Sequence, residues 1–257
     1  MGALIGMAVY STAENQKDDC LIRTLDSLRK TVDFSKHELM LSVNAATPMT
    51  SAIIHQYKDI ISKVFINASN LGTAEAINLC WKEREPGQHC IKMDDDVVIH
   101  QSGWIETMID AISRDPKIGQ IGLKRKDCWE FPYHENPDFR SEMHMLSNNG
   151  GQPWIIIEKV KHVIGTCVMH SSDLLDKVGY LRQPSLYGYD DVLMSHRSQI
   201  AGFYSCFLSH VEIDHIDHGL TPYQDWKHKH SGEQTQAVID LTHRMYRGEE
   251  SIYYNPF

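Results

Sequence analysis

The sequence lacks the features that mark several large classes of protein. It has no apolar run close to the roughly 18 residues that a membrane helix needs, and its first residues lack the basic start of a signal peptide. Internal repeats and Gly/Ser-rich linkers are absent. Basic residues are outnumbered, with 25 Lys and Arg against 34 Asp and Glu and a formal net charge of −9. We therefore expect a cytoplasmic protein without stable membrane insertion, and the charge does not indicate a nucleic acid partner.

Cysteine pairs with the spacing of redox or zinc motifs are also missing. The six cysteines are Cys20, Cys80, Cys90, Cys128, Cys167 and Cys206, and they include no C-x-x-C pair. The chain has 257 residues, so it is not a short secreted domain that depends on disulfides. These cysteines are expected to be reduced and mainly buried.

What the sequence does contain is an alternation of apolar strands and amphipathic helices. Apolar runs near residues 4–10, 38–43, 64–66 and 90–93 predict buried strands, and apolar positions at helical spacing, such as Leu21, Leu25 and Leu28, predict helices between them. This order is typical of an α/β fold with a mostly parallel central sheet flanked by helices. Ligands of such sheets lie outside the carboxyl ends of the strands.

The second half of the chain is less regular. A helix is predicted around residues 104–112 and a strand around 118–123, whereas residues 124–160 show no clear period and predict loops and ribbons. Two further helices are expected at residues 171–178 and 189–201, followed by a strand at 203–208. A His-rich loop then leads to a last helix after Ser231.

Three consecutive carboxylates, Asp94, Asp95 and Asp96, follow the fourth predicted strand. Such a repulsive cluster calls for a cation, and carboxylate oxygens at a strand end are suited to holding Mg²⁺ or Mn²⁺ against substrate phosphates. The alternative is a solvated acidic turn. Residues 97–99 disfavour it because they continue the apolar run instead of supplying the Gly or Pro of a turn.

Four stretches of the chain match one family when they are taken together. They are residues 8–11 with the helix at 23–28, residues 70–78 (NLGTAEAIN), residues 94–96 (DDD) and residues 188–192 (GYDDV). In order and spacing they resemble the family 2 glycosyltransferases of the GT-A fold. Residues 165–167 and 178–180 also fit, so the resemblance covers about residues 4–218, without the loop at 124–160 and the tail beyond Gly219.

The resemblance implies a single GT-A (Rossmann-like) domain over residues 1–257. Residues 1–100 would form the nucleotide-sugar half, 101–222 the acceptor half, and 223–257 a lid loop with a C-terminal helix. The implied activity is metal-dependent transfer of a sugar from a nucleoside diphosphate sugar, with a UDP-sugar favoured, to an acceptor hydroxyl of unknown identity. Inversion at the sugar is expected.

The same resemblance assigns the metal site and the general base. Asp96 and Asp94 would hold Mn²⁺ or Mg²⁺, and a histidine would complete the site. Spacing from Gly202 favours His215 as that ligand, with His218 as the rival. Asp191 would be the general base, kept ionised by the N-terminus of its helix, and Asp190, where the family usually has Glu, would orient it or the acceptor.

The residues expected to bind the nucleotide sugar are Tyr10, Asn44, Asn70, Asn78, Asp94, Asp95, Trp226 and Lys227. Asn44 stands where the family usually has an acid that contacts the nucleobase, so the identity of the base stays open. Tyr10 is placed to pack on the base. Trp226 and Lys227 lie in the predicted lid loop.

Two alternatives remain at this point. The D-x-D-x-V pattern beginning at Asp94 also fits a haloacid-dehalogenase-like phosphatase, although that signature strand usually opens its domain. A non-catalytic protein that binds a nucleotide sugar or carbohydrate is the other alternative. The basic triplet at residues 124–126 is either a solvated loop or an aid to an anionic acceptor.

Overall fold

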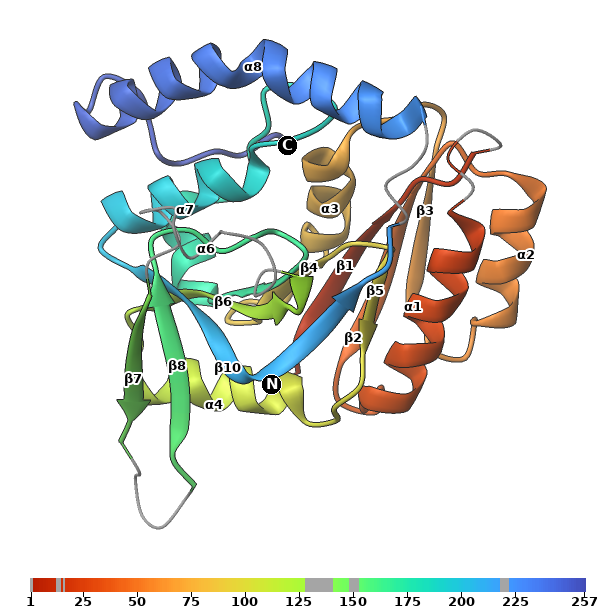
Figure 1. Cartoon of the computed structure of the whole chain (residues 1–257), viewed down its shortest axis with the longest axis horizontal. Coiled ribbons are helices and arrows are strands. Elements are labelled where there is room, and N and C mark those ends of the chain that lie inside the picture. Colours follow the sequence, from red (N-terminus) through yellow and green to blue (C-terminus); the bar gives the residue numbers. More distant parts are fainter. Residues whose placement is uncertain (1, 13–14, 16, 128–140, 148–152, 218–221) are drawn as a thin grey trace.

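The computed structural model describes residues 2–12, 15, 17–127, 141–147, 153–217 and 222–257. Its strands join in one ten-stranded sheet with helices on both faces (Figure 1). The strand order is β3-β2-β1-β4-β9-β6-β10-β8-β7, and β5 pairs with β10 beside this path. The predicted α/β class is confirmed.

The first half of the chain forms the parallel part of the sheet. Each of its strands is connected to the next by a helix, which brings the strands into parallel register and sets their carboxyl ends along one edge. The elements are β1 (Leu4–Val9), α1 (Asp18–Thr31), β2 (Glu38–Asn44), α2 (Pro48–Gln56), β3 (Lys63–Asn67), α3 (Thr73–Trp81) and β4 (Cys90–Met93).

The second half of the chain makes the sheet mixed, which corrects the prediction of a mostly parallel sheet. β9 lies antiparallel between β4 and β6, because the chain enters it from the β7–β8 ribbon through a loop and not through a crossover helix. The elements are β5 (Val97–Ile99), α4 (Trp104–Arg114), β6 (Ile118–Arg125), β7 (Glu142–Leu146), β8 (Ile155–Val160), β9 (Cys167–His170), α6 (Ser172–Val178), α7 (Asp190–Ile200), β10 (Tyr204–His215) and α8 (Pro222–Tyr246).

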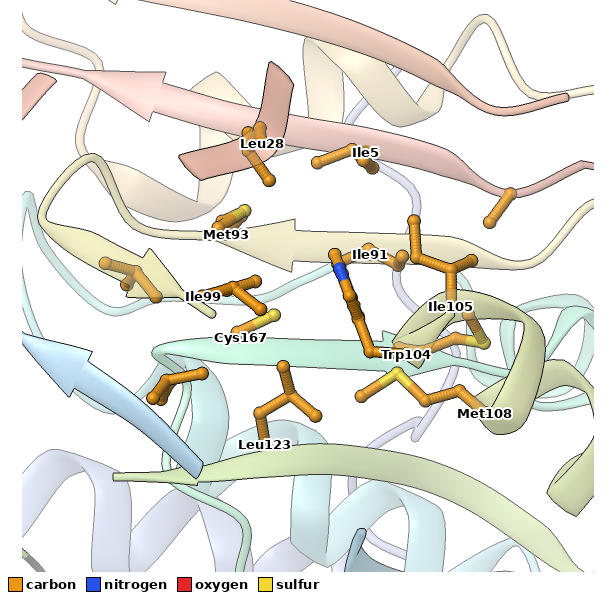
Figure 2. Close-up of a cluster of buried hydrophobic side chains, with 14 of the residues drawn as sticks. Ile5, Leu28, Ile91, Met93, Ile99, Trp104, Ile105, Met108, Leu123 and Cys167 are labelled. Carbon is orange, nitrogen blue, oxygen red and sulfur yellow. The ribbon is translucent and has the colours of Figure 1, made fainter. Parts of the chain in front are cut away.

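Two apolar layers cover the sheet. On one face α1, α2 and α4 pack against the strands, and Figure 2 shows Trp104, Ile105 and Met108 of α4 beside Ile91 and Leu123. On the other face α3, α6 and α7 form a second cluster, and α8 packs outside α7 (Figure 1). The tight packing of both layers fixes the sheet edge where the chemistry-bearing residues gather.

Two elements are longer than the sequence predicts. β10 continues past Leu208 to His215, because after a register shift between Leu208 and Glu212 it still pairs with β6 and also with β5. The strand visibly changes direction in Figure 1.

α8 begins at Pro222, well before Ser231, so the predicted lid loop is the first turns of a helix. Its His- and Lys-rich sequence carries no apolar period, although Pro is favoured at a helix start.

Among the described residues, no helix is both long enough and apolar enough to span a bilayer. The cysteines that the structure describes are buried and unpaired, as predicted. Cys128 lies outside the described residues.

Candidate active site

A cleft of about 620 Å³ opens where strands from both halves of the sheet end. Its walls combine the carboxyl ends of β1, β2, β4 and β6 with the start of α7, the end of β10 and the start of α8. The predicted site residues in its lining are Tyr10, Asn44, Asn70, Asp94, Asp95, Asp96, Asp190, Asp191, His215, Trp226 and Lys227. His218 lies outside the described residues, so the choice between the two histidines stays a prediction.

The three aspartates form a turn between β4 and β5, but this turn is not a solvated one. Asp95 and Asp96 are buried, and Asp94 is partly exposed. Thr24 of α1 holds the turn, because its hydroxyl donates to the Asp95 carbonyl at 3.0 Å and accepts from the Val97 N–H at 3.0 Å. The alternative of a solvated acidic turn is therefore wrong.

Asp95 joins two strand ends. Its Oδ2 accepts from the backbone N–H of Tyr10, at the end of β1, at 3.2 Å. Burial raises the pKa of Asp95 to about 7, against the opposing attraction of the Lys17 ammonium. This geometry positions Tyr10 beside the cleft.

Asp96 has an oxygen that is suited to a cation. Its Oδ1 is buried without a hydrogen-bond partner, and Nε2 of His215 lies 3.4 Å from it. Although burial favours the neutral acid, Lys17 and His215 hold the pKa of Asp96 below its ordinary value. In the part of the chain that the structure describes, no three His, Cys, Asp or Glu side chains converge as a metal site. Two protein donors still fit Mg²⁺ or Mn²⁺ bound mainly through substrate phosphates and water.

Sequence reasoning missed Lys17, which precedes α1 and reaches the same carboxylates. Its Nζ donates a short hydrogen bond to Asp96 and lies 3.5 Å from Asp217 Oδ2 and 3.8 Å from Asp95 Oδ1. Nζ of Lys227, in α8, donates to the same Oδ2 of Asp217 at 2.8 Å. The sequence around Lys17 is polar and shows no hydrophobic periodicity or motif that would have marked this lysine as a site residue.

The acidic pair lies at the N-terminus of α7 and lines the same cleft as Asp96. Asp190 is buried, and this burial raises its pKa despite Nζ of Lys92 at 3.3 Å. Asp191 has a side chain that is 22% exposed. Its oxygens accept from the N–H groups of Gly165 at 3.0 Å and Val192 at 2.8 Å. Of the two acids, Asp191 is the one that an acceptor can reach.

Lys92 links the aspartates after β4 to the acidic pair of α7. Its Nζ donates to the Gly165 carbonyl at 2.5 Å and lies 3.3 Å from both Asp94 Oδ1 and Asp190 Oδ2. These carboxylates raise the pKa of Lys92 although burial opposes it, so the ammonium stays charged. A Cβ on Gly165 would meet Lys92 Nζ at 2.7 Å and Asp191 Cβ at 3.0 Å, so a larger residue here would require these two side chains to shift.

His162, in the loop before β9, is another residue that the sequence did not single out. Its Nε2 lies 3.6 Å from Asp191 Oδ2, and its Nδ1 lies 3.2 Å from the hydroxyl of Ser195. The ring therefore lies against α7, where it contacts both Ser195 and the proposed base.

The asparagines of the nucleotide half have mainly structural bonds. Asn44 accepts from the Leu71 N–H at 3.2 Å and donates to the Gly72 carbonyl at 3.3 Å, which holds the loop before α3. The prediction that Asn78 contacts the nucleotide needs correction. It does not line the cleft, and its amide pairs with the backbone N–H and carbonyl of Leu181, at 3.0 and 2.8 Å.

Two residues at the start of α8, Trp226 and Lys227, lie close to the ring of Tyr187 in the loop before α7. The ring of Trp226 lies 6.1 Å from that of Tyr187, and Nζ of Lys227 lies 5.3 Å from the centre of the Tyr187 ring. All three residues line the cleft. The first turns of α8 thus form one wall of the site.

A protein-family comparison matches residues 9–179 with the sequence model described as Glycosyl transferase family 2. The matched region carries the three aspartates of the strand end and ends before the acidic pair. No curated protein matches the chain.

Several solved structures share the fold. One is the mannosyltransferase PcManGT from Pyrobaculum calidifontis in complex with GDP-Man and Mn²⁺, with a TM-score of 0.57 and 15% identity over 80% of this chain and 56% of that one. Another is GalNAc-T7 with UDP, GalNAc and Mn²⁺, with a TM-score of 0.60 and 13% identity over 84% and 44%. A third is residues 1–349 of S. aureus TarS in complex with UDP, with a TM-score of 0.58 and 16% identity over 82% and 60%. The chain therefore spans about half the length of these structures.

Proposed function

Because the chain belongs to glycosyl transferase family 2, we propose that it transfers a sugar from a nucleoside diphosphate sugar to an acceptor hydroxyl with the help of a divalent cation. One observation carries this proposal. A single cleft holds Asp96, with a buried oxygen suited to a cation, and Asp191, a partly exposed acid at a helix N-terminus. The family assignment also removes the phosphatase alternative.

The donor half of the site is built for a diphosphate. Asp96 and His215, with Asp94 directly or through water, would hold Mn²⁺ or Mg²⁺, and the bound ion would stabilise the negative charge that the leaving diphosphate gains. Lys17, Lys227 and Arg125 add positive side chains to the same part of the cleft. Tyr10 would pack on the nucleobase.

A UDP-sugar is the favoured donor. Two of the structures with this fold hold UDP, whereas PcManGT holds GDP-Man. Asn44 replaces the usual acid beside the base, and its amide is already bonded to the loop before α3. The base is therefore recognised through groups other than a carboxylate at this position.

On the acceptor side, Asp191 would take the proton of the acceptor hydroxyl as the bond to the sugar forms. Its bonds to two backbone N–H groups keep the carboxylate oriented. A single base on the face opposite the leaving group suits inversion, by analogy with glycoside hydrolysis. Asp190, which lies 3.3 Å from the Lys92 ammonium, would orient this base or the acceptor.

Calorimetry with nucleotides tests the donor half directly. UDP and GDP are titrated into the protein with and without Mn²⁺, and we expect UDP to bind more tightly and only weakly once the metal is chelated. Asp96→Ala should abolish the metal dependence, while Asp173→Ala, which removes a carboxylate that does not line the cleft, should leave it intact. Undiminished metal-supported binding by Asp96→Ala would overturn the assignment of Asp96.

A further inference from the structure

The acidic end of the cleft already contains a cation that belongs to the chain. The ammonium of Lys17 lies among three carboxylates from two segments: Asp95 and Asp96 in the turn after β4, and Asp217 after β10. The Lys17 side chain is only 8% exposed. Because a buried ammonium is stable only when it is paired, this arrangement fixes the side chain in the acidic pocket.

The pocket contains a second feature that calls for a cation. Oδ1 of Asp96 is buried without a hydrogen-bond partner and faces Nε2 of His215, while Oδ2 of the same carboxylate is bonded to Lys17. A divalent ion between Asp96 and His215 would therefore lie next to the ammonium. The two positive charges would repel each other at this short distance.

We propose that Lys17 is a counter-cation that keeps divalent metal out of the nucleotide-free site, so that metal and nucleoside diphosphate bind together. This inference rests on the proposed function and assigns Lys17 a role in the order of binding. Without nucleotide, the ammonium neutralises the crowded carboxylates. When a diphosphate enters, its oxygens offer the ammonium new partners, and Asp96 is released to bind the metal that the diphosphate brings.

Binding of Mn²⁺ by the full chain, measured from the loss of the free-ion signal in electron paramagnetic resonance, tests this inference. The wild type should bind Mn²⁺ weakly in the absence of nucleotide and tightly once UDP is added. Lys17→Met should bind Mn²⁺ alone roughly tenfold to a thousandfold more tightly, because one unit charge at this distance changes a carboxylate pKa by about one to three units. Lys17→Arg should bind Mn²⁺ alone as weakly as the wild type does, because arginine keeps the positive charge.

The matched control is Lys227→Met. Lys227 contacts Asp217 at 2.8 Å, and its removal takes the same charge from the same pocket while Lys17 stays on Asp96. We expect a much smaller gain in Mn²⁺ affinity for this variant. Equal gains for both lysine variants would overturn the proposal, since net charge alone would then explain the effect.

Thermal unfolding gives a second measurement that does not depend on activity. Lys17→Met leaves three carboxylates without this ammonium, so its melting temperature should fall in a chelator and recover with Mn²⁺ more than that of the wild type. If the variant does not fold at all, Lys17→Gln, which keeps a hydrogen-bond donor, replaces it in both measurements. A Lys17→Met or Lys17→Gln protein with wild-type affinity for Mn²⁺ alone would overturn the role of Lys17.

The outcomes separate this inference from the proposed function. If the wild type binds no Mn²⁺ even with UDP, the metal-dependent function itself is contradicted. If it binds Mn²⁺ only with UDP, and the loss of Lys17 changes nothing, the function stands and the counter-cation role fails.

Discussion

At the scale of single residues, neighbouring acids in the cleft differ because their surroundings differ. Asp190 is buried beside Lys92, whereas the side chain of Asp191 is partly exposed and held by two backbone N–H groups. A group must be within reach of the acceptor proton to act as a base. The two acids therefore have separate roles despite their adjacent positions.

This separation leads to a kinetic prediction for Asp191→Asn. The substitution keeps the shape of the side chain but removes its basicity, so turnover onto the acceptor should fall by roughly 10² to 10⁴. Affinity for the donor and the metal should barely change, because Asp191 does not touch them in this account. Near-normal transfer by Asp191→Asn together with a collapse in Asp190→Asn would make Asp190 the base. If neither variant lost transfer, the inverting mechanism would be wrong.

Sequence reasoning found the carboxylates of the site but not the cations that pair with them. Asp94, Asp95 and Asp96 stand out because consecutive acids after an apolar strand are unusual. Lys92 carried a weaker signal, since a lysine within a strand predicted to be buried needs acidic partners. Lys17 carried none, because its partners come from segments about 80 and 200 positions away in the sequence.

At the scale of elements, α7 is tied to the C-terminal segment of the chain. Arg197 is fully buried, and its guanidinium donates to the carbonyls of Val178, Tyr180 and Ile252. The backbone of Tyr254 pairs with that of Val178 and Tyr180 at 2.9 and 2.8 Å. These bonds hold the helix that carries the acidic pair at its other end.

We therefore expect Arg197→Met to lower the free energy of unfolding by about 3 kcal/mol or more, because it removes three hydrogen bonds and leaves the carbonyls of Tyr180 and Ile252 without this donor. Denaturant unfolding measures this change. Arg244→Met, at a half-exposed arginine of α8, is the control and should change stability by less than about 0.5 kcal/mol. Equal stability of the two variants would contradict the structural role of Arg197.

Element boundaries were predictable where they depend on local signals. Ser171 caps α6 through the Leu174 N–H at 3.2 Å, as the Ser-x-Asp pattern predicts. The end of β10 and the start of α8 were not predictable, because both depend on long-range contacts. His215 belongs to a strand only because Val97 of β5 pairs with it.

At the scale of the whole molecule, the site exists because one sheet joins two differently built halves. The parallel strands carry Tyr10, Asn44 and Asp96 to one edge, and the mixed half carries Asp191 and His215 to the same cleft. The alternation of strands and helices predicted the first half, and the antiparallel insertion of β9 was missed because a short strand has no signal for its direction.

The central claim is that this cleft transfers sugar from a nucleoside diphosphate donor with the help of a metal. Release of nucleoside diphosphate from a panel of UDP- and GDP-sugars, measured with Mn²⁺ and with a chelator, tests it most directly. We expect Mn²⁺-dependent release from at least one donor, lost in Asp96→Ala and retained in Asp173→Ala. The claim would be contradicted if nucleotide sugars bound in the presence of Mn²⁺ but released no more nucleotide than they do without the protein. That result would indicate a non-catalytic nucleotide-sugar-binding protein.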